Sequence, residues 1–163
     1  MTKAPLGGEA TGKNPTDRAK LGTKRSLWTD GRGTPLGVCV DGANTHDKWL
    51  VEDTINNSPI KRPWPKRSEP QNLCLDKGYN YEDVRELLAE YKFIAHIPKR
   101  GETTRRRRSL GYRARRWVVE RTHSWINRFR RLLIRWEKKV DNYESLLFLA
   151  LAWVTIRASG VYG

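Results

Sequence analysis

The segment from residue 73 to residue 97 constrains the fold most, because it has the pattern strand, helix, strand. A short apolar run at residues 73–75 ends at Asp76, and Gly78 indicates a tight turn directly after it. Residues 81–91 follow with apolar side chains on one helical face, and residues 93–97 form a second apolar run. Two strands joined by such a helix must pair in parallel. We therefore predict an α/β fold with mixed strands.

The first third of the chain predicts a hairpin and a short helix. Residues 24–29 and 35–40 have the composition of strands, and the turn between them reads Asp-Gly-Arg-Gly, which favours antiparallel pairing. Residues 1–20 are rich in Gly, Pro, Thr and Lys, so we predict an extended, turn-rich entry segment. A short helix is predicted at residues 47–54, followed by a proline-rich loop at residues 56–72.

Two helices are predicted toward the C-terminus. Residues 115–136 favour one long helix, because large apolar side chains recur there at helical spacing. This stripe consists of Trp125, Phe129, Leu132 and Trp136. Residues 143–156 predict a last helix that is apolar enough to pack on several sides, with Asp141 or Asn142 as its N-cap.

Basic residues dominate the charge and are unevenly distributed. The chain has 163 residues, a length that fits a single domain over residues 1–163, and its net charge of +14 points to a polyanionic partner. Residues 99–139 hold 16 of the 32 Lys and Arg residues but only three acids. Aromatic residues alternate with these cations, which favours a folded phosphate-binding loop and helix. For the run at residues 105–108 alone, the alternative that it is only a charged surface exposed to water stays open.

Two acids are candidates for chemistry. Asp76 ends an apolar strand, which is where ligands bind in open α/β sheets; the alternative is a turn-forming Asp. Glu120 is an isolated acid in a strongly basic stretch; the alternative is a charge-balancing residue that pairs with Arg116 or Arg121. If Asp76 and Glu120 converge, their oxygens suit Mg²⁺ or Mn²⁺. Such ions serve phosphodiester chemistry by activating the attacking oxygen and stabilising the leaving one.

Other kinds of site find little support. His46, His96 and His123 lack metal-site spacing, so a structural role is favoured for each. No glycine-rich loop opens a helix, which excludes a standard nucleotide site. Cys39 and Cys74 do not form a disulfide framework. Without a secretory signal, or an apolar run of the ~20 residues that a membrane span requires, we expect a cytoplasmic protein.

Several segments resemble motifs of bacterial insertion-sequence DDE transposases, in particular the insertion-sequence-five family. The resemblance rests on residues 7–18, 41–44, 75–79, 116–125 and 127–131. It implies a ribonuclease-H-like mixed sheet flanked by helices, and Mg²⁺-dependent cleavage and strand transfer of DNA at the element's ends. It also implies that Asp76 is the second acid of the catalytic triad and Glu120 the third, both as metal ligands. The family's signature around the last acid is matched by Tyr112, Arg116, Glu120 and Arg128, with Arg in place of the usual Lys.

The resemblance makes residues 99–139 a DNA-facing loop and helix. Arg116 and Arg128 are expected to contact DNA because they match the family's signature. The other arginines predicted to bind DNA on this helix are Arg121, Arg130, Arg131 and Arg135.

One feature of the family is missing from the chain. The family's first catalytic Asp closes a strand just upstream of the stretch that matches residues 2–5. We therefore expect a second reading frame or a remnant that lacks the first strand and is inactive alone. Activity would then need the product of the upstream frame, and we expect the active form to be a nucleoid-associated homo-oligomer.

Two further functions stay open. The first is a catalytically inactive DNA-binding fragment or regulator that uses the basic helix. The second is a basic structural or ribosome-associated protein, which explains the charge but leaves the placement of Asp76 and Glu120 unexplained.

Overall fold

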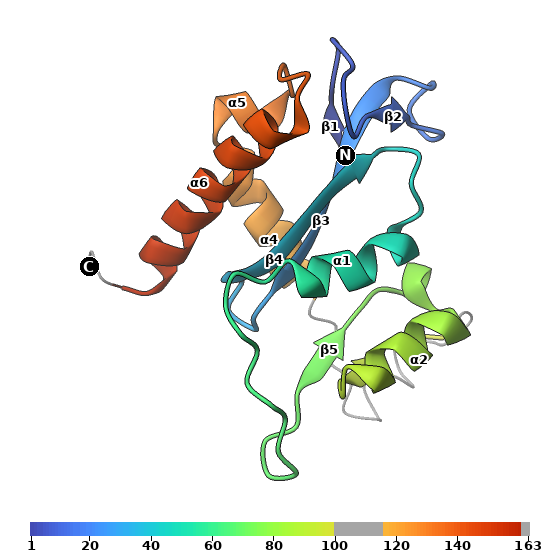
Figure 1. Cartoon of the computed structure of the whole chain (residues 1–163), viewed down its shortest axis with the longest axis vertical. Helices are drawn as coiled ribbons and strands as arrows, with labels where there is room; N and C mark the ends of the chain where they lie inside the picture. The colour runs from blue at the N-terminus through green and yellow to red at the C-terminus, as the bar shows by residue number, and fades with distance from the viewer. Residues whose placement is uncertain (100–115, 161–163) are drawn as a thin grey trace. The chain divides into compact units, whose positions relative to one another are not determined.

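The computed structural model describes residues 1–99 and 116–160, and the chain forms two compact units (Figure 1). The first unit comprises Met1–Pro59 and Val118–Gly163, and the second comprises Ile60–Trp117. Strands and helices are mixed in the chain, so the predicted α/β class is confirmed at that level. None of the helices in the described ranges is long and apolar enough to cross a membrane.

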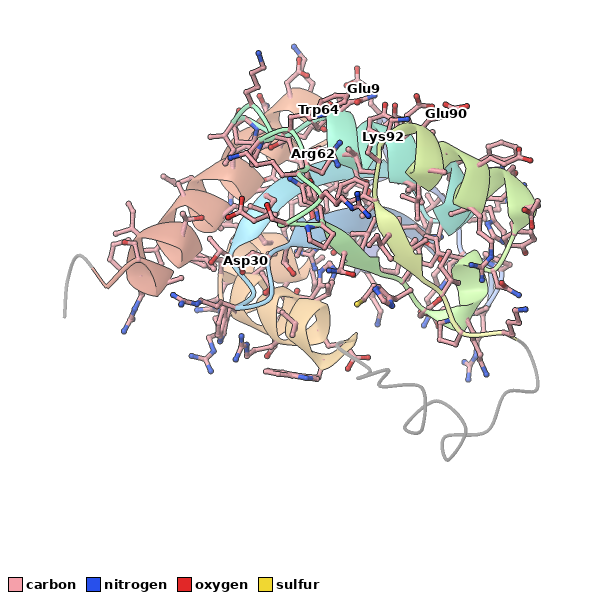
Figure 2. All side chains as sticks on the ribbon, turned by 90° about the horizontal axis from the view of Figure 1, so that it is seen from below. Glu9, Asp30, Arg62, Trp64, Glu90 and Lys92 are labelled. Carbon is pink, nitrogen blue, oxygen red and sulfur yellow. The ribbon has the colours of Figure 1, made fainter. Side chains whose placement is uncertain are left out.

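The first unit is built on an antiparallel hairpin. Strand β3 (Leu21–Thr29) pairs with β4 (Pro35–Gly42), which confirms the predicted hairpin and extends both strands. In the turn, Asp30 (labelled in Figure 2) accepts hydrogen bonds of 2.8 Å from the backbone N–H groups of Arg32 and Thr34. Gly33 has φ of +89°, a conformation that L side chains rarely adopt. The Asp-Gly-Arg-Gly sequence therefore supplies what this turn needs.

Residues 1–20 add two short strands to the same sheet. Strand β1 (Thr2–Lys3) and strand β2 (Gly12–Lys13) each pair antiparallel with the start of β3. The segment is rich in turns, as predicted, but it is also part of the sheet.

Helices pack on both faces of the hairpin, because successive side chains of a strand point to opposite sides. One face receives α1 (Val51–Asn56), preceded by the 3-10 turn η1 (Asp47–Leu50), which confirms the short helix predicted at 47–54. A Cβ atom on Gly37 would lie 2.3 Å from the carbonyl oxygen of Thr54, so glycine allows this close approach. The opposite face carries Val38, in one core cluster with side chains of the C-terminal helices.

The second unit contains the predicted strand–helix–strand crossover. Strand β5 (Asn72–Cys74), the 3-10 turn η2 (Lys77–Tyr79), α2 (Glu82–Glu90) and β6 (Ile94–His96) follow in order. Strands β5 and β6 pair in parallel, with Leu73 opposite Ala95. The buried apolar side chains of the crossover are Leu73, Val84, Leu88 and Phe93. No helix or strand interrupts residues 57–71, which confirms the proline-rich loop.

The prediction of one helix over residues 115–136 is wrong. Helix α4 (Arg116–Ile126) ends at Ile126, and a short α5 (Arg130–Leu133) follows after a turn. Ile134 is then extended and pairs with Lys3 of β1, whose carbonyl oxygen accepts a 2.8 Å bond from the backbone N–H of Arg135. Pairing with a strand 131 residues away thus holds Ile134 extended within the range predicted to be one helix.

The buried face of α4 also differs from the predicted stripe. Val118, Thr122 and Ile126 are buried at i, i+4 and i+8, whereas Trp125 is only partly buried and Trp136 is exposed. Leu132 of the predicted stripe is buried in the core.

The last helix, α6 (Val140–Ala158), begins three residues before the predicted start. Neither Asp141 nor Asn142 caps it. The backbone N–H of Val140 instead donates a 2.9 Å bond to Oε2 of Glu9 (labelled in Figure 2), from the entry segment.

Only one side of α6 is packed, contrary to the prediction of several packed sides. The buried side chains of α6 are Tyr143, Leu147, Ala150, Leu151 and Val154. Phe148, Leu149 and Trp153 are exposed.

Candidate active site and nucleic-acid interface

Asp76 lies two residues beyond the end of β5, in the second unit. Its side chain caps η2, and Oδ1 accepts a 2.6 Å hydrogen bond from the backbone N–H of Gly78. A Cβ on residue 78 would lie 2.8 Å from that oxygen, so glycine keeps the turn open. The alternative considered from the sequence, a turn-forming Asp, therefore describes the local geometry of Asp76. The carboxylate is nevertheless exposed, and the turn holds it in one orientation at the end of a buried strand.

Glu120 lies on α4 in the first unit, and its side chain is exposed. Because residues of a helix advance by about 100°, Glu120 points away from the buried face formed by Val118, Thr122 and Ile126. The buried face of α4 therefore packs against the protein, and Glu120 faces the solvent. Glu120 is the only acid of α4.

Hydrogen bonds between α4 and the hairpin hold α4 in place. Thr122 Oγ1 donates a 2.8 Å bond to the carbonyl oxygen of Gly33, and Arg121 donates to the carbonyl oxygen of Arg32. At the other end of the helix, Arg25 Nη2 donates a 2.7 Å bond to Asn127 Oδ1. Sequence analysis missed these contacts. The Asp-Gly-Arg-Gly motif indicated only a turn at residues 30–33. No local pattern in the sequence linked this turn to a helix 89 residues later.

The two candidate acids belong to different units, each held by its own local structure. Within residues 1–99 and 117–160, no group of three or more His, Cys, Asp and Glu side chains could hold a metal ion. The donor chemistry of Asp76 and Glu120 fits a hard divalent cation, because both supply carboxylate oxygens and both are exposed.

Three of the predicted DNA-binding arginines are exposed. Arg128 follows α4 in the turn, and Arg130 and Arg131 begin α5. Arg131 also forms a 3.3 Å ion pair with Glu137. The side chain of Arg116 and the basic run at residues 105–108 lie outside the described residues.

Two other arginines make contacts with other parts of the protein. The guanidinium of Arg121 lies 4.9 Å from the ring centre of Trp125, in addition to its bond to the hairpin turn. Arg135 is only 1% exposed, which corrects its prediction as a DNA contact.

Hydrogen bonds account for the burial of Arg135. Its Nε donates to the carbonyl oxygen of Glu137 at 2.8 Å, and Nη1 donates to Thr23 Oγ1 at 2.8 Å and to the carbonyl oxygen of Ala10 at 3.2 Å. The guanidinium also lies 5.0 Å from the ring centre of Tyr143. Arg135 thus joins the entry segment, β3 and α6.

The histidines occupy structural positions. His46 Nδ1 accepts a 3.2 Å bond from Lys48 N at the start of η1, and His96 Nε2 lies 2.7 Å from Asn72 Oδ1 across the parallel pair. Burial, together with the nearby positive charge of Arg25, lowers the pKa of His123 to about 4. His123 is therefore neutral at physiological pH and does not contact phosphate as a cation.

Comparison with known proteins identifies the family. The family description that matches is "Transposase DDE domain", over residues 2–155. The "Putative transposase for insertion sequence element IS402" of Burkholderia cepacia is 38% identical over 152 residues, which cover 90% of this chain and 70% of that protein. No solved structure matches the chain. An exposed acid after a strand, a second exposed acid on a helix, and exposed arginines beside it accord with this match: the chain belongs to the DDE transposases of bacterial insertion sequences.

Proposed function

We propose that Asp76 and Glu120 are two acids of a catalytic site that cleaves and joins DNA at the ends of an insertion sequence of the insertion-sequence-five branch. Family membership implies DNA as a partner and the use of a divalent metal ion. The observation that carries the proposal is the structural environment of Glu120. It is an exposed acid on a helix held from behind by buried side chains, and it is followed by exposed arginines.

Each residue has a definite task in this proposal. The turn at Gly78 restricts the carboxylate of Asp76 to one orientation, and the bonds from α4 to the hairpin do the same for the helix that carries Glu120. Arg128, Arg130 and Arg131 bind phosphate groups of the DNA backbone. A divalent ion, proposed to be Mg²⁺ or Mn²⁺, supplies activation of the attacking oxygen and stabilisation of the leaving oxygen when bound. The ribonuclease-H-like arrangement, the product of an upstream frame and the assembly of several copies belong to the same proposal.

The test replaces each carboxylate by its amide. Asp76→Asn keeps an oxygen that can accept the bond from Gly78, so the turn is preserved while the charge is lost. Glu120→Gln removes the charge from an exposed helix position. The chain is expressed together with the coding sequence that precedes Met1, and strand cleavage at the element's ends is followed with Mg²⁺.

We expect either variant to lose cleavage by at least about a hundredfold while keeping the wild-type melting temperature and DNA affinity. Glu90→Gln, an exposed acid at the end of α2, is the matched control and should retain activity. Wild-type cleavage by Asp76→Asn or Glu120→Gln would remove that residue from the mechanism.

A DNA-binding regulator that does not cleave is the second candidate, favoured by the exposed positions of Arg128, Arg130 and Arg131. Both functions predict DNA binding that weakens with salt, so binding alone does not separate them. Binding of Mn²⁺ does. Calorimetry should detect binding that either amide variant abolishes if the site is catalytic, and no such binding if the chain is only a regulator.

A further inference from the structure

A loop in the second unit presents an exposed tryptophan among cations. Trp64 is 75% exposed, the largest exposed fraction among the large apolar side chains of the described residues. The loop at residues 60–71, here the Trp64 loop, has one acid, Glu69, against four cations: Lys61, Arg62, Lys66 and Arg67. Three of those cations are exposed, while Arg62 is partly buried.

Internal contacts hold the Trp64 loop in its conformation. The guanidinium of Arg62 lies 4.1 Å from the ring centre of Phe93 and donates to the carbonyl oxygen of Tyr91 (Figure 2 labels Arg62 and Trp64). On the other side of Trp64, Gln71 Nε2 donates a 2.8 Å bond to the carbonyl oxygen of Pro63. Lys66 and Glu69 form an isolated backbone bridge. Arg62 therefore ties the start of the loop to the crossover, and the other two contacts close the loop on itself.

Prolines on both sides further restrict the position of Trp64. Pro63 and Pro65 each fix their own φ near −65°, and each biases the preceding residue toward an extended conformation. The backbone at Trp64 has little freedom left to lose on binding. A large aromatic surface is thus held in water in a preorganised state, which favours binding.

We propose that the Trp64 loop is a second DNA-binding site, in which Trp64 stacks on or wedges between bases while Lys61, Lys66 and Arg67 bind the flanking phosphates. Nucleic acid offers flat apolar faces and closely spaced negative charges in one molecule, and this combination matches the loop. The inference rests on DNA as the partner that the family implies, and it adds a site outside residues 99–139. The local sequence of the loop, Lys-Arg-Pro-Trp-Pro-Lys-Arg, indicates such a site, whereas the charge counted over a longer stretch of the chain does not.

The test measures binding of the full chain to a fluorescein-labelled DNA of about 30 nucleotides, in a duplex and a single-stranded form. Trp64→Ala should weaken binding to at least one form by fivefold or more, the lower end of what base stacking on an aromatic contributes. Trp64→Phe keeps an aromatic face and should recover most of the affinity. Trp153→Ala is the control, because Trp153 is 51% exposed on α6, where Arg157 is the single cation within four residues of it in sequence. It should bind within twofold of the wild type.

A second variant tests the cations independently. The double change Lys66→Gln and Arg67→Gln should reduce the slope of log affinity against log salt by one to two, because each phosphate contact contributes about 0.9 on duplex DNA. Melting temperatures of all variants are measured in parallel, since both substituted regions are exposed and no loss of stability is expected.

Other outcomes reject the inference. Binding by Trp64→Ala within twofold of the wild type on both DNA forms overturns it, and so does an equal loss in Trp153→Ala. A lowered melting temperature with unchanged DNA binding would show instead that Trp64 packs against another part of the protein. If the wild-type chain binds neither DNA form, DNA binding by the chain fails as a whole, which is distinguishable from failure of this loop alone.

Discussion

The side-chain hydroxyl of Thr122 donates a 2.8 Å hydrogen bond to the carbonyl oxygen of Gly33, and this bond joins helix α4 to the turn between β3 and β4. Both residues are buried, so the bond replaces water for two polar groups. Because α4 carries Glu120, the shape of a hairpin turn early in the chain positions an acid that the sequence places 87 residues later.

Gly33→Ala should therefore be costly. The residue has φ of +89°, and a Cβ atom would lie 3.0 Å from Thr122 Oγ1 and 3.1 Å from Nη2 of Arg121. We expect a loss of more than about 1 kcal/mol in the free energy of unfolding, measured by urea denaturation. Gly31→Ala is the control, because Gly31 is exposed in the same turn and does not have positive φ. Equal stability of the two variants would contradict the role assigned to Gly33.

Substitutions at Arg135 and Arg130 should separate an effect on stability from an effect on DNA binding. Arg135→Met removes the donor to the hydroxyl of Thr23 and to the carbonyl oxygen of Glu137, while the carbonyl oxygen of Ala10 keeps its bond from the Thr23 hydroxyl, so we expect a loss of roughly 2 kcal/mol or more in unfolding free energy. Arg130→Met changes an exposed side chain and should alter stability by less than about 0.5 kcal/mol.

DNA titrations at several salt concentrations complete that comparison. Arg130→Met should reduce the salt slope by about 1, as expected for one lost phosphate contact. Should Arg135→Met prove as stable as the wild type while losing DNA affinity, its predicted role as a DNA contact would be restored.

His123 should make stability depend on pH. Its pKa is about 4 in the folded protein, against an ordinary value of 6.5, because burial and then Arg25 disfavour the charged ring. Below pH 6.5 the unfolded chain therefore binds a proton that the folded chain does not, so stability falls as the pH drops from 6.5 to 4. The loss from this one residue is roughly 3 kcal/mol at most.

Unfolding free energies at pH 7 and pH 4.5 measure this effect. His123→Gln should lose less stability than the wild type between those two values. Identical pH profiles for the wild type and His123→Gln would rule out the assigned pKa.

Glu9 should act as the N-terminal cap of α6. Its Oε2 accepts the bond from the backbone N–H of Val140 at 2.9 Å, and its backbone N–H donates to the carbonyl oxygen of Lys138 at the same distance. Glu9→Ala should cost about 1 kcal/mol in thermal or urea unfolding. Glu9→Gln keeps an acceptor and should lose only part of this. Asn142→Ala, at a position that sequence favours for the cap, should have little effect; a larger loss than in Glu9→Ala would reverse the assignment.

Local patterns predicted the hairpin and the crossover well because local chemistry determines them. The Asp-Gly-Arg-Gly turn contains the acceptor and the glycine that its geometry needs, and the apolar runs at 73–75 and 93–97 are separated by a helical period. The long helix was mispredicted because its apolar spacing continued past Ile126. That spacing could not show that Ile134 pairs with Lys3.

The sequence by itself determined the family, the α/β alternation and Asp76 and Glu120 as the acids to test, because motifs, turns and periodicity are local properties of a chain. Tertiary structure alone decided which cations remain available to a polyanion. In composition Arg135 and Arg130 are equivalent, yet one is buried among carbonyl oxygens and the other faces water. It also decided that Glu9, and not Asp141, caps α6. The bonds of Arg135 to Ala10 and Thr23, and of Val140 to Glu9, join residues more than 100 positions apart, and such bonds have no local signature in the sequence.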